Sequence, residues 1–472
     1  MKCKSLRMRL TWAAVLVWIA ALMVSYPVAG AKNISDLSIP VKLDLMVNSD
    51  ENPDQVLEWN KIFIETLRET GTPNSSSQRL GAIVHTAIFD AYNGIERRYT
   101  PIFVHDVAPH GASRRAAVIA AAYTALVGLF PSRQASLNES YAASLAALSD
   151  HCENGRRSRR GQLSCAKRIE RGIDWGIVVA QAVLAWRATD GFNASYPPFI
   201  GGTAVGQWRP IPPAVQMSAQ GLAFTSMFVL DSDTQFRPGA PRSLISPTYT
   251  DDFNAVKTLG RKTGSTRTPD QTALAPFWEG NASIHWNQAA NQMARANHLR
   301  ISDNNRLLAV LNIAMADTAI TTWSAKRFYG SLPFEVTWRP ETSIPMAGND
   351  GNDNTVPDTG WQPLVTTPSH PEYPAGHPSL NGAAATILLA YFSRGQQTFT
   401  LTTVNNPDRT YTSIAQARSD GNNARVWGGM HYPSTVEISD AEGEAIANYI
   451  NLNFLQRLHR ADKDDDKEDQ EH

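Results

Sequence analysis

Apolar residues recur at helical spacing along most of the chain. In the N-terminal half this pattern predicts helices over residues 54–70, 76–95, 114–130, 139–149 and 174–188. Helical pattern resumes at Thr250 and continues through 270–277, 285–299 and 302–327, and a last helix is expected over 439–458. The pattern therefore predicts a mainly α protein.

Two stretches break the helical pattern. Residues 191–249 contain eight prolines among Gly, Trp and Phe, and the aromatic residues Trp208, Phe224 and Phe228 indicate that this long connection packs on the core. Thr398–Thr403 and Thr410–Ser413, on either side of an Asn-Asn-Pro-Asp turn, predict one small β-hairpin. The expected architecture is a helical bundle with long ordered loops.

The two ends of the chain differ from its middle. Lys2, Lys4, Arg7 and Arg9 precede a short apolar run, and small residues follow at 29–31. This order is typical of a secretory signal peptide over residues 1–31, and it predicts a secreted or periplasmic protein with no stable membrane anchor after cleavage. Residues 32–50 form a lead-in, 51–458 a single all-α domain, and 459–472 a charged tail that we expect to be disordered.

Composition adds limits on partners. The formal net charge is -1, so no global field favours nucleic acid. The basic run Arg156–Arg160 is interpreted as a solvated loop. Cys152 and Cys165 flank it, which in an oxidising compartment favours a local disulfide. Oligomeric state is left open.

Candidate chemistry is concentrated in three polar clusters of the C-terminal half. The first holds Lys326 and Trp338-Arg339-Pro340, and the last is the segment 424–433, with Arg425 and His431. Between them, Pro371–Asn381 reads Pro-Glu-Tyr-Pro-Ala-Gly-His-Pro-Ser-Leu-Asn, a tight turn that leads into the N-terminus of an apolar helix. Arg, Lys and His at helix ends, with Gly for close backbone approach, suit a tetrahedral oxyanion.

At these residues the chain resembles the vanadium-dependent haloperoxidases, together with their relatives the type 2 phosphatidic acid phosphatases and bacterial nonspecific acid phosphatases. Their shared pattern is K-x6-R-P, then P-S-G-H, then S-R-x5-H-x3-D. The resemblance is closer to exported bacterial haloperoxidase-like proteins, through Asp54–Asn60, Arg79–His85 and Pro371–His377. It covers about Asp54 to Leu455, and implies the helical fold of that superfamily, with the oxyanion site within 323–435.

The resemblance implies a role for each matching residue. Arg339, Arg425, Gly376 and Lys326 would bind vanadate, or phosphate in the same pocket. His431 would bond to vanadium, and in the phosphatases the corresponding His becomes phosphorylated. His377 would be the acid/base. His370 resembles a second active-site His of algal bromoperoxidases, which favours bromide or iodide, and Trp323 precedes Lys326 as a Trp does in fungal chloroperoxidases.

Three positions depart from the family pattern. Twelve residues, not six, separate Lys326 from Arg339, so Arg327 is an alternative cation. Ala375 replaces the family Ser, which removes a hydroxyl worth on the order of 1.5–3 kcal/mol to a bound anion. Thr435 replaces the Asp that fixes the His431 tautomer, and Glu437, Asp440 or a backbone carbonyl are candidate substitutes.

The sequence therefore predicts an exported, vanadate-dependent haloperoxidase-like enzyme. Its substrates would be hydrogen peroxide, a halide and an organic acceptor. Two alternatives stay open: a soluble acid phosphatase with His431 as nucleophile, and a catalytically degenerate relative that binds an anion without turnover. A metal-hydrolase site is disfavoured because carboxylates and His do not cluster at ligand spacing.

Overall fold

A computed structural model describes residues 54–153, 163–333 and 335–458. The predicted signal peptide, the lead-in 32–50, the basic run Arg156–Arg160 and the charged tail lie outside these residues. Cys165 is disulfide-bonded. The side chain of Cys152, its expected partner, also lies outside the described residues.

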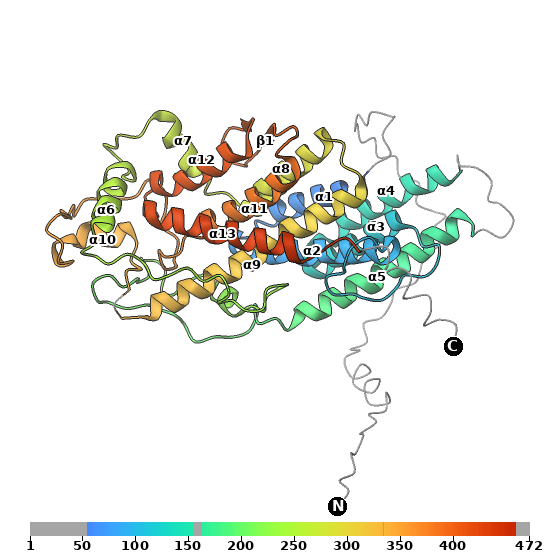
Figure 1. The fold of residues 1–472 in the computed structure, drawn as a ribbon, viewed down its shortest axis with the longest axis horizontal. Coiled ribbons are helices and arrows are strands. Elements are labelled where there is room, and N and C mark those ends of the chain that lie inside the picture. The colour runs from blue at the N-terminus through green and yellow to red at the C-terminus, as the bar shows by residue number, and fades with distance from the viewer. Residues whose placement is uncertain (1–53, 154–162, 334, 459–472) are drawn as a thin grey trace, which may run out of the picture. The chain divides into compact units, whose positions relative to one another are not determined.

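The described chain folds into helices and one small sheet, and the predicted mainly α fold is confirmed (Figure 1). The helices are α1 (Gln55–Glu69), α2 (Asn74–Glu96), α3 (Arg114–Leu129), α4 (Gln134–Glu153), α5 (Cys165–Ala188), α6 (Pro247–Leu259), α7 (Pro269–Phe277), α8 (Ala282–Ala296), α9 (Ile301–Ser331), α10 (Pro340–Met346), α11 (Gly376–Phe392), α12 (Ile414–Trp427) and α13 (Pro433–Asn453). Strands β1 (Phe399–Leu401) and β2 (Arg409–Tyr411) pair antiparallel, with Phe399 opposite Tyr411, as the predicted hairpin requires.

Helix α9 forms the core of the described structure. It packs against α2, α11 and α13, and nearly every residue from Leu307 to Lys326 is buried. Its length and mean hydropathy would suffice for a membrane span. The apolar window is nevertheless entirely covered by neighbouring helices, as in the core helix of a soluble protein. The predicted site residues Trp323 and Lys326 lie on its C-terminal half.

Helices α11 and α13 approach each other closely because glycines face the contact. A Cβ atom added at Gly443 would lie 1.8 Å from the carbonyl oxygen of Ser379, and one at Gly382 would lie 2.2 Å from that of Asp440. Only the absence of a side chain permits this spacing. The crossing holds the N-terminus of α11 beside the segment that precedes α13.

The proline-rich connection 191–249 packs on the core through two of its three named aromatic residues. Trp208 and Phe228 are buried, whereas Phe224 is 39% exposed and stacks on Tyr196. Asp317 of α9 fixes the connection, because its carboxylate accepts hydrogen bonds from the backbone N–H groups of residues 228, 229 and 230 at 2.7–3.0 Å.

The pattern reading missed or misplaced several elements. Helices α10 and α12 were not predicted, α5 begins at Cys165 rather than Asp174, and α13 begins at Pro433 rather than Ser439. Helix α12 carries Arg, Asp and Asn on much of its surface, so its apolar period is weak. The residues between Lys326 and Arg339 are accommodated because α9 continues to Ser331 before the chain turns back.

Candidate active site

A cavity of about 200 Å³ lies where α9, α11 and the segment after α12 meet. Six of the predicted site residues line it: Trp323, His370, Gly376, His377, Arg425 and His431. The other lining residues are Asn74, Ser75, Ser218, Glu279, Pro368 and Met430. Segments far apart in the sequence thus converge on one site, and the roles of the individual residues stay predictions.

His431 has a defined tautomer. Its Nε2 atom lies 3.0 Å from Nη1 of Arg339, and because a guanidinium can only donate, Nε2 must carry a lone pair. The proton is therefore on Nδ1, which donates to Oε1 of Glu372 at 2.9 Å. Nε2 is thus the unprotonated nitrogen, as a metal ligand or a nucleophile requires, and its lone pair here accepts a hydrogen bond from Arg339.

Glu372 holds His431 in this state, and the sequence reading missed this residue. Its Oε1 atom also accepts from the Tyr432 N–H at 3.1 Å, and its Oε2 accepts from the Thr435 hydroxyl at 3.1 Å. The carboxylate that the family pattern supplies from the position of Thr435 is thus supplied here from the turn before α11. Thr435 supports it as a hydrogen-bond donor.

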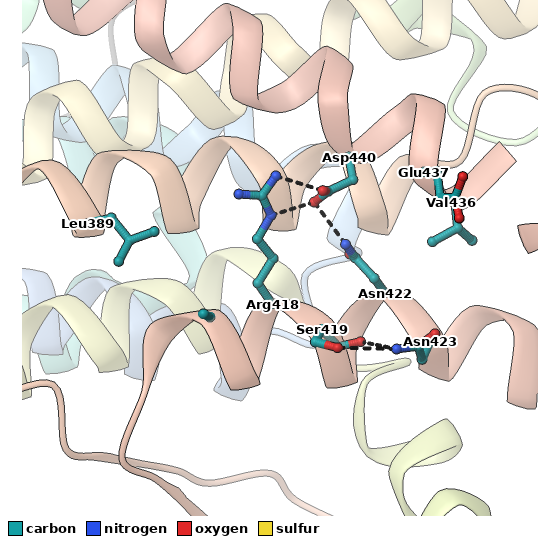
Figure 2. Close-up of a pocket in the computed structure, with 9 residues that line it drawn as sticks. Leu389, Arg418, Ser419, Asn422, Asn423, Val436, Glu437 and Asp440 are labelled. Carbon is teal, nitrogen blue, oxygen red and sulfur yellow. Dashed lines mark hydrogen bonds and ion pairs between the residues drawn. The ribbon is translucent and has the colours of Figure 1, made fainter. Parts of the chain in front are cut away.

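The candidate substitutes Glu437 and Asp440 do not occupy this position. Glu437 is exposed, and the Asp440 carboxylate is bound by Arg418, with Arg418 Nε donating to Oδ1 at 2.7 Å. Both lie on α13 beside a different pocket, of about 300 Å³, formed with α12 and Leu389 (Figure 2). Its cation, Arg418, also binds Glu444, so that pocket offers no uncommitted cation for an anion.

Arg339 lies behind the cavity wall and ties two imidazoles together. Its Nη1 donates to the Met430 carbonyl at 2.7 Å and to His431, its Nε donates to the His370 carbonyl at 3.0 Å, and its Nη2 lies 2.8 Å from Nδ1 of His370. His370 Nδ1 must therefore accept, which places its proton on Nε2. Arg339 can reach an anion only beside His431. Its Nη1 would then share its hydrogen bond between His431 Nε2 and the anion, or give up the bond to His431.

Arg425, at the C-terminal end of α12, has few partners for a buried guanidinium. Its Nη1 lies 3.4 Å from the Trp278 carbonyl, its Nη2 donates to the Met430 sulfur at 3.0 Å, and its Nε has no partner. The side chain is 2% exposed. A buried cation held by a long contact and a weak thioether acceptor is poised to bind an anion in the cavity.

The N-terminus of α11 supplies backbone donors. Its N-cap, Ala375, makes no side-chain capping hydrogen bond, so Gly376 and His377 begin the helix without one. Glycine is required here, because a Cβ atom on Gly376 would lie 2.9 Å from Cζ3 of Trp323. His377 Nε2–H donates to the Gly280 carbonyl at 3.1 Å, which orients the ring against the loop between α7 and α8.

Lys326 does not line the cavity. Its Nζ donates to the carbonyls of Pro371 and Glu372 at 2.6 and 3.2 Å, so it fixes the turn that carries Glu372 and His370. Arg327 points away from the site, where its guanidinium covers the rings of Phe199 and Phe224. A direct contact between Lys326 and the anion stays a prediction.

Burial and positive charge keep the site imidazoles neutral. Burial, then the charges of Arg339 and Lys326, lower the pKa of His431 well below its usual value. Burial likewise lowers the pKa of His370 and of His377, and Arg425 adds to the effect at His377. Burial raises the pKa of Glu372 to about 7, and the charges of Arg339 and Lys326 oppose this rise.

These features fit a tetrahedral oxyanion bound at His431. The unpartnered Nε of Arg425, the unpartnered indole N–H of Trp323 and the uncapped start of α11 are donors without acceptors, and the Nε2 lone pair of His431 is their complement. An oxyanion whose oxygens accept these hydrogen bonds would satisfy the three sets of donors, and its central atom would take the His431 lone pair in place of the Arg339 contact.

Comparison with known proteins identifies the fold. Residues 306–460 match the family model of the VCPO second helical-bundle domain. The fold resembles the crystal structure of a bacterial vanadium-dependent iodoperoxidase, with a TM-score of 0.70 at 21% identity over 87% of this chain and 98% of that one. It also resembles an apo-type bacterial vanadium-dependent chloroperoxidase, with a TM-score of 0.61 at 16% identity over 80% of this chain and 93% of that one.

No curated protein sequence matches the chain. The matched segment contains α9 from Arg306 onward and α10 to α13, and hence every residue predicted for the site. The family-model match covers residues 306–460, and the chain shares its fold with these two bacterial vanadium-dependent enzymes.

Proposed function

We propose that this protein is a vanadate-dependent haloperoxidase that uses hydrogen peroxide to oxidise a halide to hypohalous acid. The observation that carries the proposal is the neutral His431, whose Nε2 lone pair faces a buried site rich in cationic and backbone donors. The reaction balances as halide, hydrogen peroxide and one proton giving hypohalous acid and water.

Vanadate bound at this site would supply a Lewis acid that activates peroxide toward halide. His431 Nε2 would hold it, and Glu372 keeps the proton on Nδ1 so that the lone pair stays available. Arg425, the N–H groups at the start of α11 and Arg339 would compensate the negative charge on the oxygens.

Two further imidazoles suit the proton steps. His377 is neutral and lines the cavity, so it can accept a proton from peroxide and return it to the leaving oxygen. His370 lines the same cavity with its proton on Nε2, which makes it a donor toward the bound groups. We propose iodide or bromide as the halide, because His370 stands where the resemblance implies a second active-site His.

The predicted signal peptide supports the further proposal that the enzyme works outside the cytoplasm. A peroxide-consuming enzyme that releases hypohalous acid suits that compartment, because the reactive product forms away from the cytosol. Small molecules are the proposed substrates.

The decisive experiment is halide oxidation by purified protein with orthovanadate and peroxide, followed with a halogenation dye. We expect a vanadate-dependent signal with iodide or bromide, and we expect His431→Ala to lower it by at least about 100-fold, since the lone pair that holds vanadate is lost. His110→Ala, a change at an exposed His on another part of the chain, is the matched control. No vanadate-dependent signal with any halide would refute the proposal.

The same lone pair also favours a second candidate, a phosphatase with His431 as nucleophile. Vanadate and phosphate share shape and charge, so the donors that fit one fit the other. Hydrolysis of a phosphate ester that vanadate inhibits, with phosphate trapped on His431, would favour this reaction over halide oxidation.

A further inference from the structure

The loop between α7 and α8 places a carboxylate where an anion-binding cavity would not be expected to have one. Among the described residues that line the cavity, Glu279 is the one acidic side chain. It is not a mobile surface residue that meets the cavity by chance, because both of its neighbours in sequence are tied to the site. Arg425 Nη1 contacts the Trp278 carbonyl and His377 Nε2–H donates to the Gly280 carbonyl.

The position of Glu279 has an electrostatic consequence. The negative charge of Glu279 and the positive charge of Arg425 attract each other. The carboxylate therefore reduces the positive electrostatic potential that Arg425 produces in the cavity. The Glu279 side chain is exposed to solvent, whereas Arg425 is buried, which puts the negative charge at the mouth and the positive charge inside. An anion that enters beside Glu279 meets the carboxylate before it reaches the buried guanidinium.

We propose that Glu279 is a specificity-determining residue that raises the KM for the halide by repelling anions at the cavity mouth, without affecting the neutral peroxide. The proposal rests on the proposed function, because it concerns the halide step of that reaction. Such a gate also limits occupancy by other small anions, which compete with the halide for the same positive site.

The test compares Glu279→Gln, which removes the charge but keeps the shape, with Glu437→Gln. Glu437 is also an exposed glutamate beside a pocket, but it lines the separate pocket of Figure 2 and the net-charge change is identical. The measurement is KM and kcat for iodide and bromide, and KM for peroxide, at low and at high salt.

We expect Glu279→Gln to lower the halide KM by about three- to ten-fold at low salt, as one partly screened charge at short range would. The difference should shrink at high salt, since exposed charges are screened, while the peroxide KM stays within about two-fold. Glu437→Gln should leave all three constants unchanged. An unchanged halide KM in Glu279→Gln, or an equal shift in Glu437→Gln, overturns the proposal.

A binding measurement separates this proposal from the proposed function. If no halide is oxidised by any of the three proteins, the haloperoxidase proposal fails. The charge effect is then measured by titration of the proteins with orthovanadate and with inorganic phosphate. Tighter binding of both anions to Glu279→Gln than to wild type and Glu437→Gln supports the gate, and equal binding overturns it.

Discussion

At the scale of single residues, the site depends on a carboxylate that sits outside the family pattern. Glu372 fixes the proton of His431 on Nδ1, and Tyr432 N–H and the Thr435 hydroxyl fix Glu372 in turn. A hydrogen-bond partner of this kind orients the ring and raises the basicity of the ligating nitrogen. The substitution of Thr435 for Asp is therefore compensated from a different segment.

Glu372→Gln should lower vanadate affinity by about 10–100-fold, because an amide can turn its NH₂ toward Nδ1–H and no longer favours that tautomer. The measurement is vanadate titration, with circular dichroism to show that the fold is intact. Glu442→Gln is the matched control, since Glu442 is also a buried carboxylate, but it is bound by Thr322 and Ser379 rather than by a site His. Equal losses in both variants would contradict the role of Glu372.

At the scale of elements, the site depends on how closely α11 and α13 pack. The start of α11 carries Gly376 and His377, and the turn before α13 carries His431, so their spacing is set by the glycine contacts at Gly382 and Gly443. The sequence predicts α13 from the spacing of its apolar residues and α11 from the tight turn that leads into an apolar stretch. It could not show that glycines decide their distance, since a glycine in a helix has several explanations.

Gly443→Ala should destabilise the protein by at least about 2 kcal/mol, because the new methyl group would overlap the backbone of α11 and the helices would have to separate. The free energy of unfolding from urea titration measures this. Gly239→Ala serves as the control, since a Cβ atom there meets nothing within 4 Å. A Gly443→Ala protein as stable as Gly239→Ala would show that the crossing tolerates extra volume.

At the scale of the whole described chain, long-range polar contacts hold irregular segments on the helical core. Asp317 binds three successive backbone N–H groups of the proline-rich connection, and Asp90 binds those of residues 102–104 in the same way. These buried N–H groups have no helix or strand partner, so a carboxylate from a helix satisfies them. The connection in turn brings Ser218 to the cavity wall.

The titration of Asp317 gives a prediction about pH. Burial raises its pKa from 3.8 to about 6, with the three N–H groups opposing the rise. A carboxyl with a raised folded-state pKa contributes stability below the unfolded value, and this is lost as pH rises through the folded value. The stability of wild type relative to Asp317→Asn should therefore fall by up to about 3 kcal/mol between pH 4 and pH 7.

Urea unfolding of both proteins at several pH values between 4 and 7 measures this difference. Asp353→Asn, a change at an exposed aspartate, should show no comparable trend. A difference that grows with pH would mean that the three N–H groups outweigh the cost of burying the charge.

Local sequence was enough to predict most of the helices and the residues of the candidate site. Apolar periodicity located ten of the helices approximately and the hairpin, because burial of one face imposes that period wherever the partner lies, and the turn at 371–381 located an eleventh, α11. The sequence also placed His377 in one polar cluster and Arg425 and His431 in another, and the order of the clusters along the chain carries the resemblance to the family. Apolar periodicity did not predict α10 or α12, because a short or polar helix depends on tertiary contacts for its stability.

Which side chains meet in the site depends on contacts between distant segments of the chain. Glu372 reaches His431 across 59 positions of the chain, and Glu279 reaches the cavity from a loop that shows no pattern. We expected Arg339 and Lys326 to contact the anion, but both lie behind the cavity wall. Lys326 donates to a backbone carbonyl, and Arg339 donates to the carbonyl and the imidazole of His370. Which polar groups are satisfied and which remain free depends on distances between segments, and a sequence pattern does not contain those distances.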